Sequence, residues 1–435
     1  MRCRAGRPLP RAGRGRSGVR RFRPCRRRAA RGTYEGSAKV SIESGKELPA
    51  HDPFVIAPAI LAATRHLGVV LTASTTYEHP FALARRFSTL DHLSDGRLGW
   101  NVVTSYLPNA AANFGLDGML DHDARYDRAD EFLEVSFKLW EGSWGDGSFV
   151  GDRASGTFAH ADRVRTIDHI GEQFRVKGPH LSPPSPQRTP MIFQAGWSAR
   201  GKQFAARNSE VLFAGSQPAA VMKAGIDDVR DQAADLGRDP SSISFLGAFS
   251  VVTAPTAIAV QEKFDRLQHF HERGFESRIA EYAGWSGIDL SKYADDERIG
   301  PSDGSRVQHD VPGAAPTAGE IRASLRTLGA DSPNVFIGTP DQVADLIEAY
   351  AGHRGSTGSC FAASSRPARS KTSPNTSFRD SWNGESIAMT HRQEPFATAS
   401  AEAMRASMRV IRPRHTAGSR SNNAPVGRLV DREGR

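Results

Sequence analysis

Residues 66–105, HLGVVLTASTTYEHPFALARRFSTLDHLSDGRLGWNVVTS, contain the pattern that decides the fold. Their first nine residues are mostly apolar and β-branched, which is typical of a strand buried on both faces of a sheet. A turn and a helical period follow in PFALARRFSTLDHL, and RLGWNVVTS then begins a second buried strand. The stretch therefore predicts one βα unit and the strand of the next.

The same alternation of buried strand and amphipathic helix continues toward the C-terminus. Six βα units are counted in all, and the second has a long helix in residues 122–142. Strands that alternate with helices predict parallel pairing, and this chain length favours closure into a (β/α)8 TIM barrel. A doubly wound open sheet is the alternative, but no G-x-G-x-x-G motif opens the first helix. The four further units span residues 191–208, 211–237, 244–274 and 334–350.

The two ends of the chain differ from its middle in charge. The 435 residues carry a formal charge of +9, yet residues 1–32 contain 13 arginines and no acidic residue, and residues 352–435 carry +8. Residues 33–351 are therefore acidic, with a net charge of −12. We expect one barrel domain over 33–351 between two disordered ends, whose Arg/Gly/Pro and Ser/Arg composition would also result from out-of-frame translation.

Charge, hydropathy and cysteine positions exclude several classes of function. An acidic body does not fit a basic groove for nucleic acid, and no run of 18 apolar residues indicates a membrane span. Cys3, Cys25 and Cys360 all lie in the two ends, so the body has no thiol for a disulfide, a zinc site or a nucleophile. The spacing of His269 and His271 does not match that of metal-binding histidines. We expect a cytoplasmic protein without a metal site.

Neutral polar residues gather where the expected strands end. In a barrel the C-terminal ends of the strands line the site. This set lacks the paired carboxylates of a glycosidase and suits a flat, amide-rich cofactor such as an isoalloxazine, although ordinary capping of strand ends is the alternative. The residues are Thr72, Ser74, Asn101, Thr104, Ser105, Gln194, Gly196, Ser198, Gly215 and Ser216.

Two motifs at helix starts could hold an anion or line the site. In QAGWSARGKQFAA, residues 194–206, a strand and a glycine precede Ser198 at an N-cap position. The free N–H groups of such a helix favour a phosphate, and a plain capped helix is the alternative. His122 and Tyr126 of HDARY are four residues apart and share a helix face, either in a site or as a cap and a packing residue.

Five long motifs carry a resemblance to a known family. They are residues 72–117, 122–144 (HDARYDRADEFLEVSFKLWEGSW), 178–215, 287–293 (GIDLSKY) and 337–347 (IGTPDQVADLI). They closely resemble the nitrilotriacetate, dibenzothiophene-sulfone and long-chain-alkane monooxygenase group of the bacterial-luciferase-like superfamily, and the resemblance covers roughly residues 33–351. It implies a TIM barrel that binds reduced FMN (FMNH2) from a separate NAD(P)H:flavin reductase and forms dimers or tetramers. O2 would then give a C4a-(hydro)peroxyflavin that oxygenates a small organic substrate.

The resemblance also implies roles for individual residues. Contacts to the flavin ring and ribityl chain are expected from Thr72, Asn101, Ser105 and Tyr126. A phosphate cradle is expected at Gly196 and Ser198 with the N–H groups that follow. The expected catalytic residues are Tyr106, which matches a position on the substrate side of the flavin, and His122 in the same wall.

The resemblance breaks down at both ends of the chain. Family members have an early strand that ends in an F-x-A-D-like segment whose Asp contacts flavin, and the Arg-rich residues 1–32 stand there instead. The Ser/Arg-rich residues 352–435 likewise replace the last strand and helix of the family. We therefore expect a barrel incomplete at both ends. Two alternatives stay open: a catalytically impaired remnant of the barrel, and a coenzyme F420-dependent oxidoreductase on the same fold.

Overall fold

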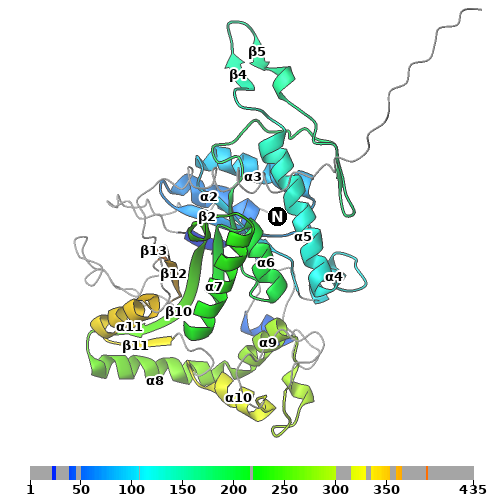
Figure 1. Cartoon of the computed structure of the whole chain (residues 1–435). Coiled ribbons are helices and arrows are strands. Elements are labelled where there is room, and N and C mark those ends of the chain that lie inside the picture. Colours follow the sequence, from blue (N-terminus) through cyan, green and yellow to red (C-terminus); the bar gives the residue numbers. More distant parts are fainter. Residues whose placement is uncertain are drawn as a thin grey trace, which may run out of the picture.

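A nine-stranded sheet lies at the centre of the molecule (Figure 1). The computed structural model describes residues 22–25, 39–45, 50–106, 108–215, 219–299, 315–329, 335–352, 359–364 and 388–389. The sheet runs in the order β1 (Phe22–Cys25), β2 (Gly68–Ser74), β3 (Leu98–Val103), β8 (Met191–Gln194), β9 (Val211–Gly215), β10 (Ser244–Thr253), β12 (Ser359–Ser364) and β13 (Ala388–Met389), while β11 (Val335–Gly338) also pairs with β10. All the pairings are parallel except that of β12 with β13.

This pairing forms a partial barrel, and the predicted α/β class is confirmed. Strand β10 is long enough to pair with two strands in tandem, because Phe245–Ser250 face β12 and Ser250–Thr253 face β11. Within the described residues no ladder joins β1 to β11, β12 or β13, so the sheet stays open between its first and last strands. The expectation of an incomplete barrel agrees with this arrangement.

Helices cover the sheet in the alternation expected from the sequence. Several of these helices begin at a side-chain cap that lies within three residues of the N–H it binds. Asp52, Ser198 and Thr256 each accept a hydrogen bond from a backbone N–H of the first turn. Among the described residues, no helix is both long and apolar enough to cross a membrane. The helices are α1 (Lys39–Ser44), α2 (Pro53–Ala63), α3 (Pro80–Ser94), α4 (Pro108–Asn113), α5 (His122–Phe137), α6 (Ala199–Asn208), α7 (Ala219–Asp235), α8 (Ala257–Arg273), α9 (Phe275–Ser286), α10 (Ala318–Arg326) and α11 (Pro340–Gly352).

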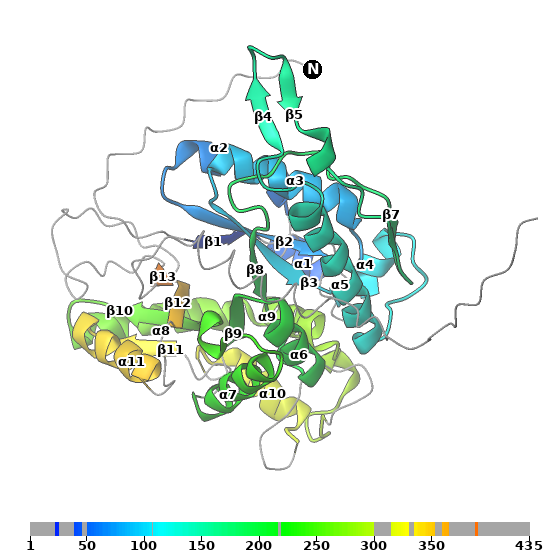
Figure 2. The same cartoon turned by 45° about the horizontal axis from the view of Figure 1, so that its top comes forward.

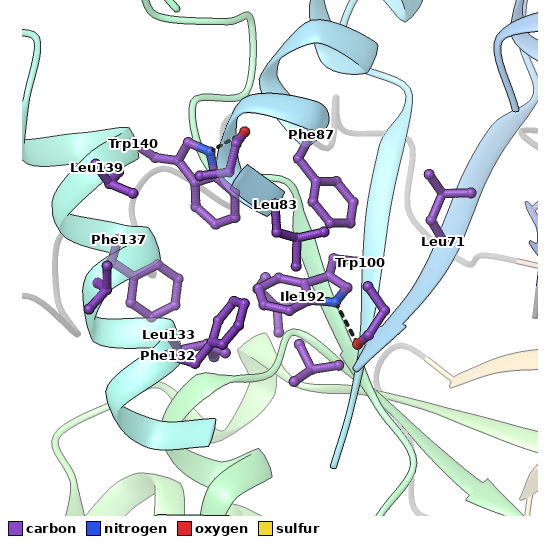
Figure 3. Packing of buried hydrophobic residues seen from close by; sticks show 14 of the residues in the cluster. Leu71, Leu83, Phe87, Trp100, Phe132, Leu133, Phe137, Leu139, Trp140 and Ile192 are labelled. Carbon is purple, nitrogen blue, oxygen red and sulfur yellow. Dashed lines mark hydrogen bonds between the residues drawn. The ribbon is translucent and has the colours of Figure 1, made fainter. Parts of the chain in front are cut away.

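The largest core cluster packs α2, α3 and α5 against β2 and β3 (Figure 3). Trp100 of β3 is fully buried between Phe87 of α3 and Phe132 of α5, and its indole N–H donates to the carbonyl of Ala73 at 3.2 Å. A second cluster packs α7 and α11 against β9 and β10. These two cores hold the strands in place, so the ends of the strands are rigid supports for a site.

Two hairpins interrupt the barrel between α5 and β8. The first, β4 (Phe149–Asp152) with β5 (Thr157–Ala159), projects away from the body in both views (Figure 2). The second, β6 (His169–Ile170) with β7 (Arg175–Val176), is fastened to α5 by Glu131, which accepts hydrogen bonds from the N–H groups of Gln173 and Phe174. The connection between α5 and β8 is therefore held against α5 by its second hairpin.

Three short strands lie in the end segments for which the sequence predicted disorder. Of residues 1–32 the structure describes 22–25, which form β1 and pair with β2. Of residues 352–435 it describes Gly352 at the end of α11 and the strands β12 and β13. The expectation of disorder rested on side-chain composition, whereas strand addition at a sheet edge uses backbone groups, so it is wrong for these strands. The rest of both segments lies outside the described residues, and the division at 32/33 and 351/352 stays a prediction.

Candidate active site

The expected site residues Thr72 and Asn101 are brought together by strand register. They are direct partners in the β2–β3 ladder, and the Asn101 amide Nδ2 donates to the Thr72 hydroxyl at 3.1 Å. The other amide atom, Asn101 Oδ1, is buried and has no hydrogen-bond partner among the described residues. A buried carbonyl oxygen is costly to leave unpaired, so this end of β3 can accept a hydrogen bond from a bound group.

Ser105 lies just beyond the end of β3 and contacts the end of β2. Its hydroxyl oxygen is 2.8 Å from that of Ser74, and its backbone is left-handed, with φ of 57°. Tyr106 follows with a side chain that is 40% exposed. The structure therefore places Ser105 beside Thr72 and Asn101 at the ends of neighbouring strands, and it places Tyr106 at the surface next to them.

Ser198 caps α6 after the β8 strand, as the sequence predicted. Its hydroxyl accepts a hydrogen bond from the N–H of Gly201 at 3.1 Å. The chain reaches this cap through Gly196, where an added Cβ would lie only 2.1 Å from the Tyr126 hydroxyl. At Gly201 an added Cβ would lie 2.8 Å from the same hydroxyl. Both glycines are thus required by the close approach of α5 to the first turn of α6.

His122 and Tyr126 from α5 face this first turn of α6. The His122 Nε2 atom is 3.2 Å from the Ser198 hydroxyl, and its Nδ1 is 2.6 Å from a carboxylate oxygen of Asp123. Tyr126 is almost fully buried, and burial raises the pKa of its hydroxyl, which remains a neutral group near pH 7. His122, Tyr126 and Ser198 therefore form one group, although Ser198 is more than 70 positions away from the other two in sequence.

Gln194 joins this group from the last position of β8. Its Nε2 lies 3.4 Å from the Tyr126 hydroxyl, and its Oε1 is buried without a hydrogen-bond partner among the described residues. The sequence placed Gln194 among the polar residues at strand ends but gave it no role. Its orphaned oxygen is the second unpaired amide acceptor at the C-terminal ends of the strands, after that of Asn101.

Arg200 in the first turn of α6 is a structural residue that the sequence reasoning missed. Its guanidinium donates to Asp127 at 2.9 Å and to Asp130 at 2.6 Å, and it lies over the Tyr126 ring. Asn208 at the other end of α6 also donates to Asp130. This clamp fixes α6 against α5. The only local signal for it was the i, i+3 spacing of the two aspartates, which also fits a solvated helix face.

Both groups lie toward the carboxyl ends of β2, β3 and β8, but on different faces of the sheet, because the ladder pairs Asn101 with Phe193 and Val102 with Gln194. In parallel α/β barrels this edge carries the active site. Within the described residues no group of three or more His, Cys, Asp or Glu side chains could hold a metal ion. The arrangement is that of a barrel enzyme whose site offers neutral hydrogen-bonding groups at one end and a helix N-terminus at the other.

Comparison with known proteins identifies the family of this barrel. The family model described as luciferase-like monooxygenase matches residues 11–357, and the chain belongs to that family. It is 40% identical over 315 residues to the long-chain alkane monooxygenase of Geobacillus thermodenitrificans, covering 72% of this chain and 68% of the relative. It is 39% identical over 333 residues to the dimethyl-sulfide monooxygenase of Hyphomicrobium sulfonivorans, covering 75% and 68%. The protein is thus a monooxygenase, an oxidoreductase, by family.

Two solved structures support the same fold assignment. The long-chain alkane monooxygenase LadA superposes with a TM-score of 0.69 at 39% identity, covering 75% of this chain and 72% of that one. A riboflavin lyase, RcaE, solved with modified FMN and riboflavin, superposes with a TM-score of 0.71 at 35% identity, covering 79% and 76%. Both are similar to this chain over most of its barrel.

Proposed function

We propose that the chain is a flavin-dependent monooxygenase that binds FMN at the carboxyl ends of β2, β3 and β8. The observation that carries the proposal is the pair of buried, unpaired amide oxygens, Asn101 Oδ1 and Gln194 Oε1. Each needs a hydrogen-bond donor. A reduced flavin offers N–H donors on its ring and hydroxyl donors on its ribityl chain, so its chemistry fits these acceptors.

The neutral end of the site fits the flavin ring. Thr72, Asn101 and Ser105 offer hydroxyl and amide groups on adjacent strands, without a full charge among them. Such groups hold a flat, uncharged ring edge without the desolvation cost of burying an ion. We infer that these three residues hold and orient the ring, as the family resemblance implies.

The other end of the site fits the phosphate of FMN. The first turn of α6 offers N–H groups and the positive end of a helix dipole, and Gly196 allows Tyr126 to pack close to this turn. His122 is within hydrogen-bond distance of Ser198 there. We therefore propose that His122 acts with Ser198 and Tyr126 at the phosphate end, whereas the expected catalytic role of His122 in the substrate wall stays a prediction.

The protein's part in the reaction is to bind, orient and shield. When bound, reduced flavin supplies the electrons that activate O2. Thr72, Asn101 and Ser105 would fix the ring, and the buried Trp100 core beneath them keeps these strands rigid. Delivery of reduced FMN by a separate NAD(P)H:flavin reductase, the C4a-(hydro)peroxyflavin, a cytoplasmic location and a dimer or tetramer belong to this proposal as implied by the family resemblance.

We assign the substrate side of the proposed site to an apolar group of residues in the connections after β2 and β3. Tyr77 stacks on Phe114 with ring centroids 4.3 Å apart, and its hydroxyl donates to the sulfur of Met119. Leu116 and Leu120 on the same connection from β3 to α5 are exposed. Phe114, Met119 and the two leucines follow Tyr106, the expected catalytic residue, in the sequence. They support a small organic substrate, in keeping with relatives named for alkane and dimethyl sulfide oxidation.

The test is an anaerobic titration with reduced FMN, reduced riboflavin and reduced F420. In Ser198→Asp the new carboxylate keeps the helix cap but repels a phosphate, so we expect FMN affinity to fall about tenfold or more while riboflavin affinity is nearly unchanged. Thr256→Asp, the same kind of change at the cap of α8, is the matched control. Unchanged FMN affinity in Ser198→Asp would reject the phosphate site, and preference of the wild type for F420 would favour the alternative oxidoreductase.

A further inference from the structure

Ser105 has a backbone conformation that serine rarely adopts. Its φ of 57° lies in the left-handed region, which is unfavourable for residues with a Cβ. Asp95 has a similar φ of 53°, but it is the C-cap of α3, where helices commonly end in this way. Ser105 follows a strand, so its conformation needs another cause. Such conformations persist where neighbouring groups fix them.

The hydroxyl of Ser74 is a neighbouring group that contacts the side chain of Ser105. Ser74 is the last residue of β2, and its oxygen lies 2.8 Å from the Ser105 hydroxyl. The same oxygen accepts a hydrogen bond from the N–H of Thr76 at 3.2 Å. A serine hydroxyl has one proton and two lone pairs. Ser74 can therefore accept from Thr76 and donate to Ser105 at the same time.

Two further hydrogen bonds tie the strand ends on either side of this contact. The Thr75 N–H donates to the carbonyl of Val103 at 3.0 Å, and the Thr76 hydroxyl donates to the carbonyl of Thr104 at 2.7 Å. Thr75 and Thr76 are buried, so these bonds are shielded from water. These hydrogen bonds hold the chain as far as Thr104. The contact between the hydroxyls of Ser74 and Ser105 lies at the residue that follows.

We propose that Ser74 is a positioning residue of the cofactor site. This inference rests on the proposed function, because it takes Ser105 as a flavin contact. Ser74 donates its proton to Ser105 and holds the left-handed turn there. The proton of Ser105 is then directed to a hydrogen-bond acceptor on the bound flavin, such as a ring carbonyl. Ser74 itself acts through Ser105 and does not need to touch the cofactor.

The experiment is a double-mutant cycle on affinity for reduced FMN under anaerobic conditions. Ser74→Ala and Ser105→Ala are each expected to weaken binding by about fivefold, the scale of one hydrogen bond. Their combination is expected to lose no more than Ser105→Ala alone, because both hydroxyls serve one interaction. Ser74→Thr keeps the hydroxyl and is expected to restore wild-type affinity.

A control separates this positioning role from general stability. Ser136→Ala removes another buried serine hydroxyl, which bonds to the carbonyl of Phe132 in α5 at 2.8 Å, away from the strand ends. We expect it to lower thermal stability without changing FMN affinity. Wild-type affinity in Ser74→Ala, or losses that multiply in the double variant, would overturn the role of Ser74. Failure of the wild type to bind reduced FMN would instead overturn the proposed function on which it rests.

Discussion

The two ends of the candidate site are built in different ways. At the ends of β2 and β3, Thr72 and Asn101 meet because strand register pairs them, and neutral groups hold one another. At the start of α6, Ser198 meets His122 because two helices are clamped together by Arg200 and a pair of aspartates. The first end depends on the buried sheet, and the second on charged contacts between helices. Conditions that weaken one need not weaken the other.

Acid should weaken the end of the site formed by β2 and β3, the sheet-based end, through His180. Its ring bonds to Ser88 of α3, in the core beneath β2 and β3, and burial, followed by the nearby Arg85 and His92, lowers its pKa from 6.5 to about 4. Because the unfolded chain takes up the proton first, stability is full above about pH 6.5 and falls as the pH drops toward 4. We expect a loss of roughly 3 kcal/mol between pH 7 and pH 4, measured by urea unfolding.

The matched variant for this acid effect is His180→Gln. It is expected to be less stable at pH 7 but to lose this part of the pH dependence. A variant with the same slope as the wild type between pH 6.5 and pH 4 would show that another group carries the effect.

A methyl group at Gly196 should disrupt the packing at the start of α6, the helix-based end of the site. The Cβ of Gly196→Ala would lie 2.1 Å from the Tyr126 hydroxyl and 2.4 Å from the Gln194 amide, so the buried tyrosine must move. We expect a loss of FMN affinity of roughly 30-fold, the scale of overpacking a tight site. Gly142→Ala, where no atom lies within 4 Å of the added Cβ, should bind FMN normally. Near-normal FMN affinity in Gly196→Ala would contradict the close packing assigned to this turn.

Removal of the charged clamp should affect only the helix-based end. Arg200→Met keeps much of the side-chain volume but removes the bonds to Asp127 and Asp130. We expect FMN affinity to fall about tenfold, because a partly buried charged contact is lost and α6 is less firmly held. Riboflavin affinity should change little. Equal losses for FMN and riboflavin would mean that the clamp supports the whole site.

The smallest expected effect is at the sheet-based end. Thr72→Val removes the hydroxyl that accepts from the Asn101 amide while keeping the β-branched shape suited to the strand. We expect FMN and riboflavin affinity to fall together by about threefold, because Asn101 loses one of the contacts that orient it. A loss of affinity for FMN alone would place Thr72 at the phosphate end of the site and contradict its assignment to the end that holds the flavin ring.

Local patterns in the sequence were sufficient for the barrel units and for one cap. The apolar run in residues 66–74 predicted β2, and the serine before a helical period predicted the Ser198 cap; both are confirmed. Such features depend on neighbours within a few positions. The same reasoning placed His122 and Tyr126 on one helix face, as observed.

The contacts between distant elements could not be predicted in this way. Arg200 looks like an ordinary charged residue of a surface helix, and only packing of α6 on α5 gives it two carboxylate partners. The left-handed Ser105 has no glycine or asparagine to signal it. The strand β12 was missed because residues 359–364 lie in a Ser/Arg-rich tail, yet their backbone pairs with β10.

The most direct test of the central claim is an anaerobic titration of the purified wild-type chain with reduced FMN, followed by admission of O2. The account predicts saturable binding at one flavin per chain, and flavin oxidation after O2 admission with kinetics that differ from those of free reduced FMN. A folded chain that neither binds reduced FMN nor changes its reaction with O2 would contradict the account.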